Sequence, residues 1–219
     1  MSVPRWAVSV SLMLLFIVAA PCARAGEEDP VARAEQLLAR ADARVATLKD
    51  FQATVRARTR ISLLPAVELS GRVYFRRPNR LKVDLDNLPT VVARVRRQMT
   101  SEPPYGNRKA YEPRWLRAET CDGKPCDVIE FKSRDASRKL QRMTIWLDQG
   151  ASILPKTVLD YADGSQCTIT TTYGKIGAFL LPMTSEIEAR ASPVTVRSSV
   201  TYSGHTVNKD IPDTVFDRK

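Results

Sequence analysis

Cysteine and histidine are the side chains with the most chemical potential in this sequence of 219 residues, which holds four cysteines and one histidine. Cys121 and Cys126 enclose a short turn in the stretch CDGKPCD. In an oxidising compartment this spacing predicts a disulfide across the turn. A metal ion could use the same pair, but there is no second cysteine pair and His205 is distant in sequence, so we predict no metal site. Cys167 is left over, and we expect it to be buried in a strand.

Catalytic motifs are absent from the sequence. It contains no G-x-S-x-G nucleophile elbow, no glycine-rich phosphate loop and no H-E-x-x-H motif. His205 lies in YSGHTVNKD, which is typical of a solvent-facing turn. Asp160 and Asp163 lie at a predicted hairpin tip, where short acidic side chains favour turns. We therefore predict a protein that is not an enzyme and that needs no cofactor.

Basic residues are in excess, with 34 lysines and arginines against 24 acidic residues and a formal net charge of +10. Arg56, Arg58 and Arg60 alternate along one face of a predicted strand. Proteins that bind single-stranded nucleic acid place aromatic side chains among such charges, and little beyond Tyr74 is available here. We therefore predict no nucleic-acid partner, and a solvated face that can contact anionic lipid headgroups transiently.

The first 25 residues have the pattern of a secretory signal peptide. Arg5 supplies the positive start, an apolar run extends from about Trp6 to Ala20, and small residues at 23 and 25 have cleavage-site spacing. The apolar run is shorter than the roughly 20 residues that span a bilayer, which favours cleavage over a membrane anchor. We therefore expect an exported chain with a single domain at residues 26–219.

The rest of the sequence predicts one helix followed by many strands. Asp29 and Pro30 are typical of a helix start, and apolar residues then recur every three or four positions as far as Leu48. From Phe51 to Ile61 the odd positions are mostly apolar and the even positions are polar, which is the period of a strand with one buried face. Similar stretches predict strands at residues 67–75, 81–85, 115–121, 126–132, 141–148, 156–161, 166–173, 183–191, 194–202 and 206–208.

Consecutive strands with a single apolar face imply an antiparallel sheet, and a twisted open sheet of about ten strands must curl. The arginine-rich segment 89–100 predicts a second helix, and residues 101–114 predict a long surface loop. We therefore predict an α+β fold, in which a curled antiparallel sheet forms an incomplete β-barrel of about ten strands. One or two helices cover the concave face, and an apolar cavity occupies the part that they leave uncovered.

Several stretches occur in an order that suggests a family. They are LKDFQATV (48–55), SGRVYFRRPNRLKVDL (70–85), TIWLDQGASILPKTVLDYADG (144–164) and VNKDIPDTVF (207–216). The most specific piece is a glycine, an aliphatic and an aromatic residue followed by Arg-Arg-Pro-Asn, which is met between Gly71 and Asn79. This order resembles the LolA-like superfamily, the periplasmic lipoprotein carriers and their relatives.

The resemblance implies a half β-barrel with helices across its cavity, and a protein that ferries lipid-modified cargo through the periplasm without an enzymatic step. It implies that Arg77, just before the proline, hydrogen-bonds to the covering helices and gates the lid, and that Leu81 and Val83 line the cavity. The chain departs from the carriers at segment 89–100 and at the cysteine hairpin, so part of the rim is remodelled. The cargo is accordingly either lipoprotein or free lipid.

We therefore predict a periplasmic carrier that shuttles such cargo toward the outer membrane between membrane-bound donor and acceptor proteins. Two other functions on the same sheet stay open. One is an envelope-stress regulator that binds a partner protein, and the other is a small enzyme that acts on an amphiphile. The predicted cavity residues are Phe51, Val55, Val73, Phe75, Leu81, Val83 and Leu85.

Overall fold

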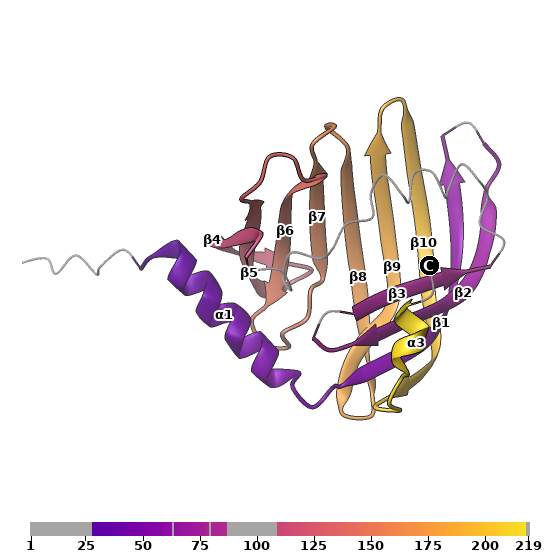
Figure 1. Cartoon of the computed structure of the whole chain (residues 1–219), viewed down its shortest axis with the longest axis horizontal. Coiled ribbons are helices and arrows are strands. Elements are labelled where there is room, and N and C mark those ends of the chain that lie inside the picture. Colours follow the sequence, from indigo (N-terminus) through magenta and orange to yellow (C-terminus); the bar gives the residue numbers. More distant parts are fainter. Residues whose placement is uncertain (1–27, 63, 79, 87–108, 218–219) are drawn as a thin grey trace, which may run out of the picture.

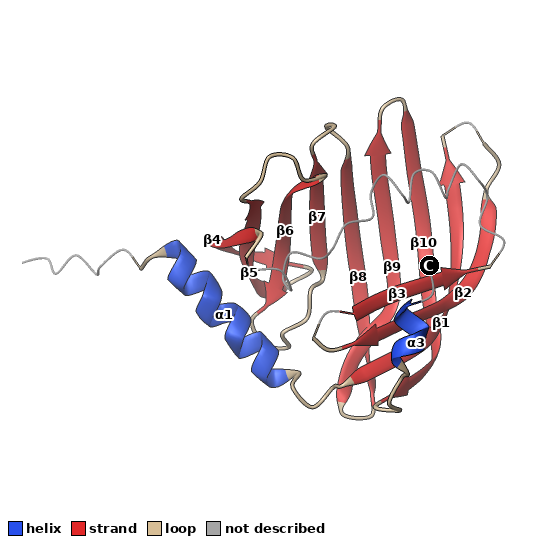
Figure 2. Cartoon of the chain, in the orientation of Figure 1, coloured by secondary structure: helices blue, strands red, loops and turns tan. Residues whose placement is uncertain are grey.

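Ten antiparallel strands form one open sheet that curls around a concave face, and a helix lies across part of that face (Figures 1 and 2). This computed structural model describes residues 28–62, 64–78, 80–86 and 109–217. The elements are α1 (Pro30–Arg44), β1 (Asp50–Ile61), β2 (Val67–Arg76), β3 (Arg80–Leu85), β4 (Tyr111–Cys121), β5 (Lys124–Ser133), β6 (Leu140–Asp148), β7 (Lys156–Tyr161), β8 (Gln166–Ile176), β9 (Phe179–Ala191), β10 (Val194–Val207) and α3 (Asp213–Asp217).

The sheet consists of two meanders that join where β1 pairs with β10. Its strand order is β3-β2-β1-β10-β9-β8-β7-β6-β5-β4, so β3 and β4 lie at opposite ends and the described strands do not close into a barrel. The predicted curled antiparallel sheet of about ten strands is therefore confirmed. The physical cause is the alternation of side chains, since each strand has only one face to bury.

Helix α1 begins where the sequence predicts and ends earlier. The Asp29 carboxylate accepts a hydrogen bond from the backbone N–H of Val31 at 3.0 Å, which satisfies one of the free donors of the first turn. Ala34 and Leu38 are buried on the stripe that faces the sheet. The helix ends at Arg44, and Leu48, which was expected to extend the stripe, is buried in the connection to β1 instead.

Strand boundaries differ from the predictions mainly at three places, one of which is the β8–β9 hairpin, where β8 runs on to Ile176 and β9 starts at Phe179 instead of residue 183. β4 starts at Tyr111, so residues 111–114 of the predicted surface loop are strand; Pro113 is tolerated there because β4 is an edge strand of the described sheet, where a missing N–H costs least. β10 runs without interruption to Val207 because a register shift near Gly204, whose φ is +60°, keeps it paired with β1.

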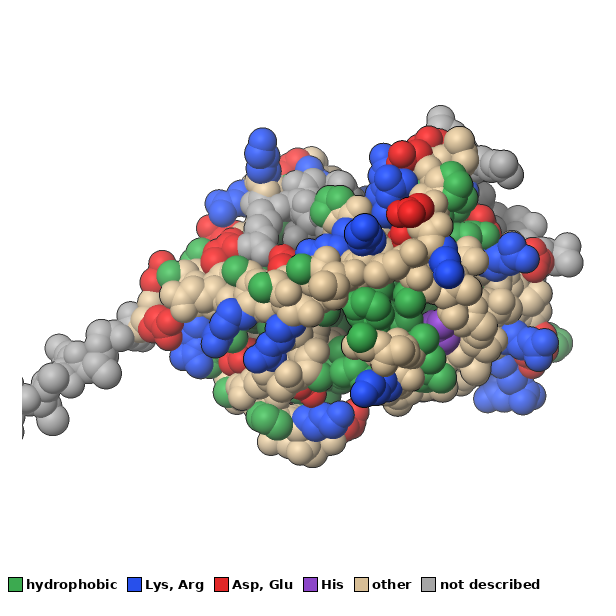
Figure 3. Space-filling view, turned by 90° about the horizontal axis from the view of Figure 1, so that it is seen from below, with side chains coloured by type: hydrophobic (Ala, Val, Ile, Leu, Met, Phe, Trp, Pro, Cys, Tyr) green, Lys and Arg blue, Asp and Glu red, His purple; other side chains and the backbone are tan. Residues whose placement is uncertain are grey.

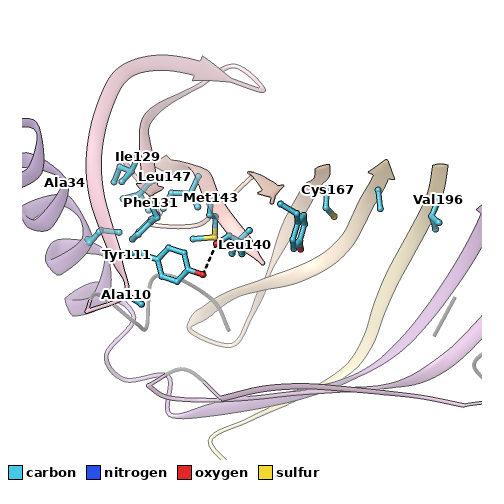
Figure 4. Packing of buried hydrophobic residues seen from close by; sticks show 14 of the residues in the cluster. Ala34, Ala110, Tyr111, Ile129, Phe131, Leu140, Met143, Leu147, Cys167 and Val196 are labelled. Atoms are coloured by element: carbon cyan, nitrogen blue, oxygen red, sulfur yellow. Dashed lines mark hydrogen bonds between the residues drawn. The ribbon is translucent and has the colours of Figure 1, made fainter. Parts of the chain in front are cut away.

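Close packing fills the concave face beneath α1 (Figure 4). Ala34 of the helix faces Tyr111 and Phe131, which are 1% and 0% exposed. The Tyr111 hydroxyl donates a hydrogen bond to the carbonyl of Leu140 at 3.2 Å, so its one polar atom is satisfied inside the core. Val196, on β10, lies farther along the sheet from the helix.

Some predictions fall on residues outside the described ranges. They are the signal peptide at 1–25, the arginine-rich helix at 89–100, Asn79, and residues 101–108 of the long loop. In the part of the chain that the structure describes, no helix has the length and apolar character needed to cross a bilayer.

Candidate ligand cavity

An apolar cavity of about 350 Å³ lies on the concave face, next to the core that α1 covers. The cavity wall continues from one meander to the other, because the paired strands β1 and β10, where the meanders join, form the centre of the wall. The lining residues are Val55, Ala57, Thr59, Leu69, Val73, Val83, Leu85, Leu159, Tyr161, Cys167, Ile169, Ile187, Ala189, Val196, Ser198, Val200 and Tyr202.

Four of the seven predicted cavity residues line this space, namely Val55, Val73, Val83 and Leu85. The other three, Phe51, Phe75 and Leu81, follow the same inner face to the end of the sheet. They occupy directly paired positions on β1, β2 and β3, and the two phenyl rings stack with centroids 5.4 Å apart. Leu81 is 52% exposed. We call these three residues the apolar track, since they connect the cavity wall to the end of the sheet.

The far wall of the cavity was not predicted as part of the site. It comes from β7 to β10, where Ile169, Ile187 and Val200 are typical members. Each of these strands was predicted, and its inward residues alternate as those of β1 do. The sequence does not say that β10 pairs with β1, because that contact joins residues about 150 positions apart in the chain (Phe51 with Val207).

A hydrogen bond between two side chains lies within the cavity wall. The hydroxyls of Thr59 and Ser198, which face each other on β1 and β10, lie 2.8 Å apart. Cys167 adds a thiol that is 6% exposed, and burial raises its pKa to about 11, so it is uncharged at neutral pH. Among the described residues that line the cavity, none is a histidine, an acidic residue, a lysine or an arginine. The cavity therefore suits an uncharged, apolar group.

Arg77 joins the open part of the sheet to the end of α1. Its guanidinium donates to the carbonyl of Val45, the C-cap residue, at 3.2 Å, and its backbone N–H donates to the carbonyl of Lys49 at 2.9 Å. The guanidinium also lies 3.8 Å from the Asp42 carboxylate. From the helix side, Arg44 donates to the carbonyls of Gln149 and Gly150. The contact expected for Arg77 is present, and its gating role stays a prediction.

Three solved structures have this architecture. A domain provisionally assigned as an outer membrane lipoprotein-sorting protein from Vibrio parahaemolyticus has a TM-score of 0.65 at 15% identity, over 85% of this chain and 97% of its own. A DUF1329 family protein from Desulfovibrio piger has a TM-score of 0.63 at 14% identity, over 87% and 98%. A LolA superfamily protein from Nitrosomonas europaea has a TM-score of 0.56 at 18% identity, over 84% and 97%.

The chain has the LolA-type fold. No family model and no curated protein matches the sequence, so the likeness is one of fold. It extends over most of both chains in each comparison, and it confirms the resemblance that the sequence suggested at that level.

The hairpin β4–β5 of this LolA-type sheet carries two cysteines, whose side chains point to the outer face of the sheet. Cys121 and Cys126 are both free thiols, so the predicted disulfide is not present in the structure. In the β4–β5 register Cys121 is opposite Lys124 and Cys126 is opposite Glu119, so the two cysteines are diagonal neighbours. The bond stays a prediction for the oxidised protein.

His205 is not the solvent-facing turn residue that was predicted. It lies within β10, is half-buried, and its Nε2 is 2.8 Å from the carbonyl oxygen of Pro182. This backbone contact gives the side chain a structural role. Among the described residues, no group of three or more histidine, cysteine or acidic side chains is placed to hold a metal ion.

Proposed function

We propose that this protein is a carrier that binds the alkyl chain of a lipid, or of a lipid-modified protein, in the cavity of its LolA-type sheet. The observation that carries the proposal is the apolar cavity of about 350 Å³, which is within the range of about 300 to 1,000 Å³ found for ligand pockets. Its uncharged lining suits hydrocarbon. No observation among the described residues specifically favours either alternative, the partner-binding regulator or the small enzyme.

The energetics favour a protein that works with membrane partners. Burying each methylene group contributes about 0.8 kcal/mol, so a cavity that holds part of one alkyl chain gains several kcal/mol before opposing costs. A bilayer offers the same apolar environment, so extraction needs help from a donor and release needs an acceptor. We therefore place the protein in the periplasm, between membrane-bound donor and acceptor proteins, with lipoprotein or free lipid moving toward the outer membrane.

Fluorescent fatty acid titration tests the proposal directly. Ile187 lines the cavity and packs against both groups of core residues that border it, so Ile187→Trp should fill the space. We expect binding to weaken at least tenfold, while circular dichroism shows an intact sheet. Leu64→Trp is the matched control, because Leu64 is 49% exposed and does not line the cavity.

Two results would overturn the proposal. One is the absence of fatty acid uptake by the wild-type protein, together with no amphiphile found by mass spectrometry in protein purified from cell envelopes. The other is undiminished uptake by a folded Ile187→Trp variant, which would place any bound lipid elsewhere.

A further inference from the structure

The hairpin between β8 and β9 has an apolar tip that the carrier cavity does not explain. Its residues run Lys175-Ile176-Gly177-Ala178-Phe179-Leu180, and Ile176 pairs with Phe179 across the turn. Gly177 has a φ of +59°, which suits the first position of a two-residue hairpin turn. Ala178 is exposed, and Leu180 is 41% exposed. We call residues 175–180 the apolar tip.

The loop between β1 and β2 also carries an exposed apolar side chain, Leu64, but three other hairpins of the same sheet have polar turns. Their turns contain Asp122-Gly123 between β4 and β5, Asp163-Gly164 between β7 and β8, and Ser192-Pro193 between β9 and β10. Those residues are the usual choice for a turn in water, because they supply hydrogen bonds and the required backbone angles. The apolar tip needs only its glycine for the turn, so its aliphatic and aromatic side chains have another role.

The apolar tip lies at the same end of the sheet as the apolar track. β9 begins at the tip, β10 ends beside the start of β9, and Phe51 of β1 pairs with Val207 at the end of β10. This end is the lower one in Figure 1, and hydrophobic side chains gather on it in the view from below (Figure 3). Four large hydrophobic side chains are exposed among the described residues, and two of them, Leu81 and Leu180, lie at this end of the sheet.

Positive charge accompanies the exposed apolar groups. Lys175 is exposed on the tip itself, and Lys49 and Lys209 are exposed at the same end of the sheet. Two arginines nearby, Arg76 and Arg80, share the single carboxylate of Asp213, which neutralises one of their two charges. The whole chain has a formal net charge of +10, which favours an anionic surface over a neutral one.

We propose that the apolar tip inserts into the headgroup region of an anionic lipid bilayer and docks this end of the protein on the membrane. A two-residue turn with its flanking residues offers far less area than a stable protein interface, whereas a bilayer needs no complementary shape. Aliphatic and aromatic side chains beside lysines suit the boundary between headgroups and acyl chains. The proposal deepens the carrier function and rests on it in one respect: docking brings the apolar track, and so the cavity, to the membrane.

Vesicle co-sedimentation tests the docking. Wild-type protein should bind vesicles that contain phosphatidylglycerol in phosphatidylcholine, and bind pure phosphatidylcholine more weakly. Leu180→Asp and Ala178→Asp should each lower the partition coefficient about tenfold or more, because each places a charge at the depth where the apolar group lies. Leu64→Asp is the matched control at the opposite end of the sheet and should partition as the wild type does.

The outcomes separate docking from the carrier function. Unchanged partition of both tip variants, an equal loss in Leu64→Asp, or no binding of the wild type would overturn docking. Fatty acid uptake in solution should be normal in both tip variants, which also shows that they fold. Tip-dependent vesicle binding without any fatty acid uptake by the wild type would leave docking standing and remove the carrier function.

Discussion

The two halves of the concave face have the same alternation of side chains, but one half is packed core and the other lines a cavity. Beneath α1, the inward side chains of β5 are completely buried, with Ile129 and Phe131 both 0% exposed. On β3, at the opposite end of the sheet, Val83 and Leu85 are only half-buried and line the cavity. The difference comes from what lies above the strands. Alternation alone makes a dry face, and a covering element decides whether that face is core or binding site.

Large-to-small substitutions should show this difference most strongly. Phe131→Ala leaves a hole in a closely packed region and should lower the free energy of unfolding by about 3–5 kcal/mol. Val83→Ala removes less, from a side chain that already borders open space, and should cost about 1 kcal/mol or less. Urea denaturation followed by circular dichroism measures both. Equal losses would show that the two halves are packed alike.

Alkaline pH should test how dry the cavity wall is. Burial raises the pKa of the Cys167 thiol from an ordinary value near 9.0 to about 11, so the fold favours the neutral thiol. Its contribution to stability is therefore complete below about pH 9 and is lost as the pH rises through about 11, by about 3 kcal/mol in all. The difference in unfolding free energy between wild type and Cys167→Ala should narrow or reverse over that range. A difference that stays constant with pH would mean that water reaches the thiol.

Oxidation should join Cys121 and Cys126, whose side chains lie on the outer face of the half of the sheet that α1 covers. A Cys121–Cys126 disulfide closes a short loop, which would stabilise the fold by about 2 kcal/mol if the hairpin adjusts without strain. Burial raises the pKa of both thiols, that of Cys126 to about 11, so exchange with oxidised glutathione should be slow at neutral pH and faster as the pH rises. Mass spectrometry after alkylation follows the bond. Cys121→Ser is the control, and failure to oxidise at any pH would exclude the bond.

Arg77 connects the two halves, and its removal should have only a small effect on stability. Arg77→Met loses the hydrogen bond to the Val45 carbonyl and should cost about 1 kcal/mol. If the contact gates the cavity, fatty acid release measured by stopped-flow fluorescence should also become faster. Arg72→Met, at an exposed arginine of the preceding strand β2, is the control. Reduced stability with an unchanged release rate would make Arg77 a structural tie and would remove its gating role.

Much of the fold could be predicted because its determinants are local. The alternation in β1 and the capping residue Asp29 each depend on neighbours in sequence, and the structure places them as expected. Four of the seventeen residues that line the cavity were also among those predicted from this pattern, all on β1 to β3. The lower end of the sheet is harder, because Phe51 and Leu81 look like core residues in the sequence, and only Leu81 proves largely exposed.

The sequence by itself determined which face of most strands is dry, where the helix begins and that about ten strands follow it, because side-chain period and capping act over a few residues. Only the tertiary structure decided that β10 pairs with β1, that α1 covers one half of the sheet, and that Cys121 and Cys126 are diagonal neighbours. Those contacts join residues far apart in the chain or depend on strand register. The free energy that stabilises those contacts depends on the packing of the complete domain, so no local sequence pattern predicts them.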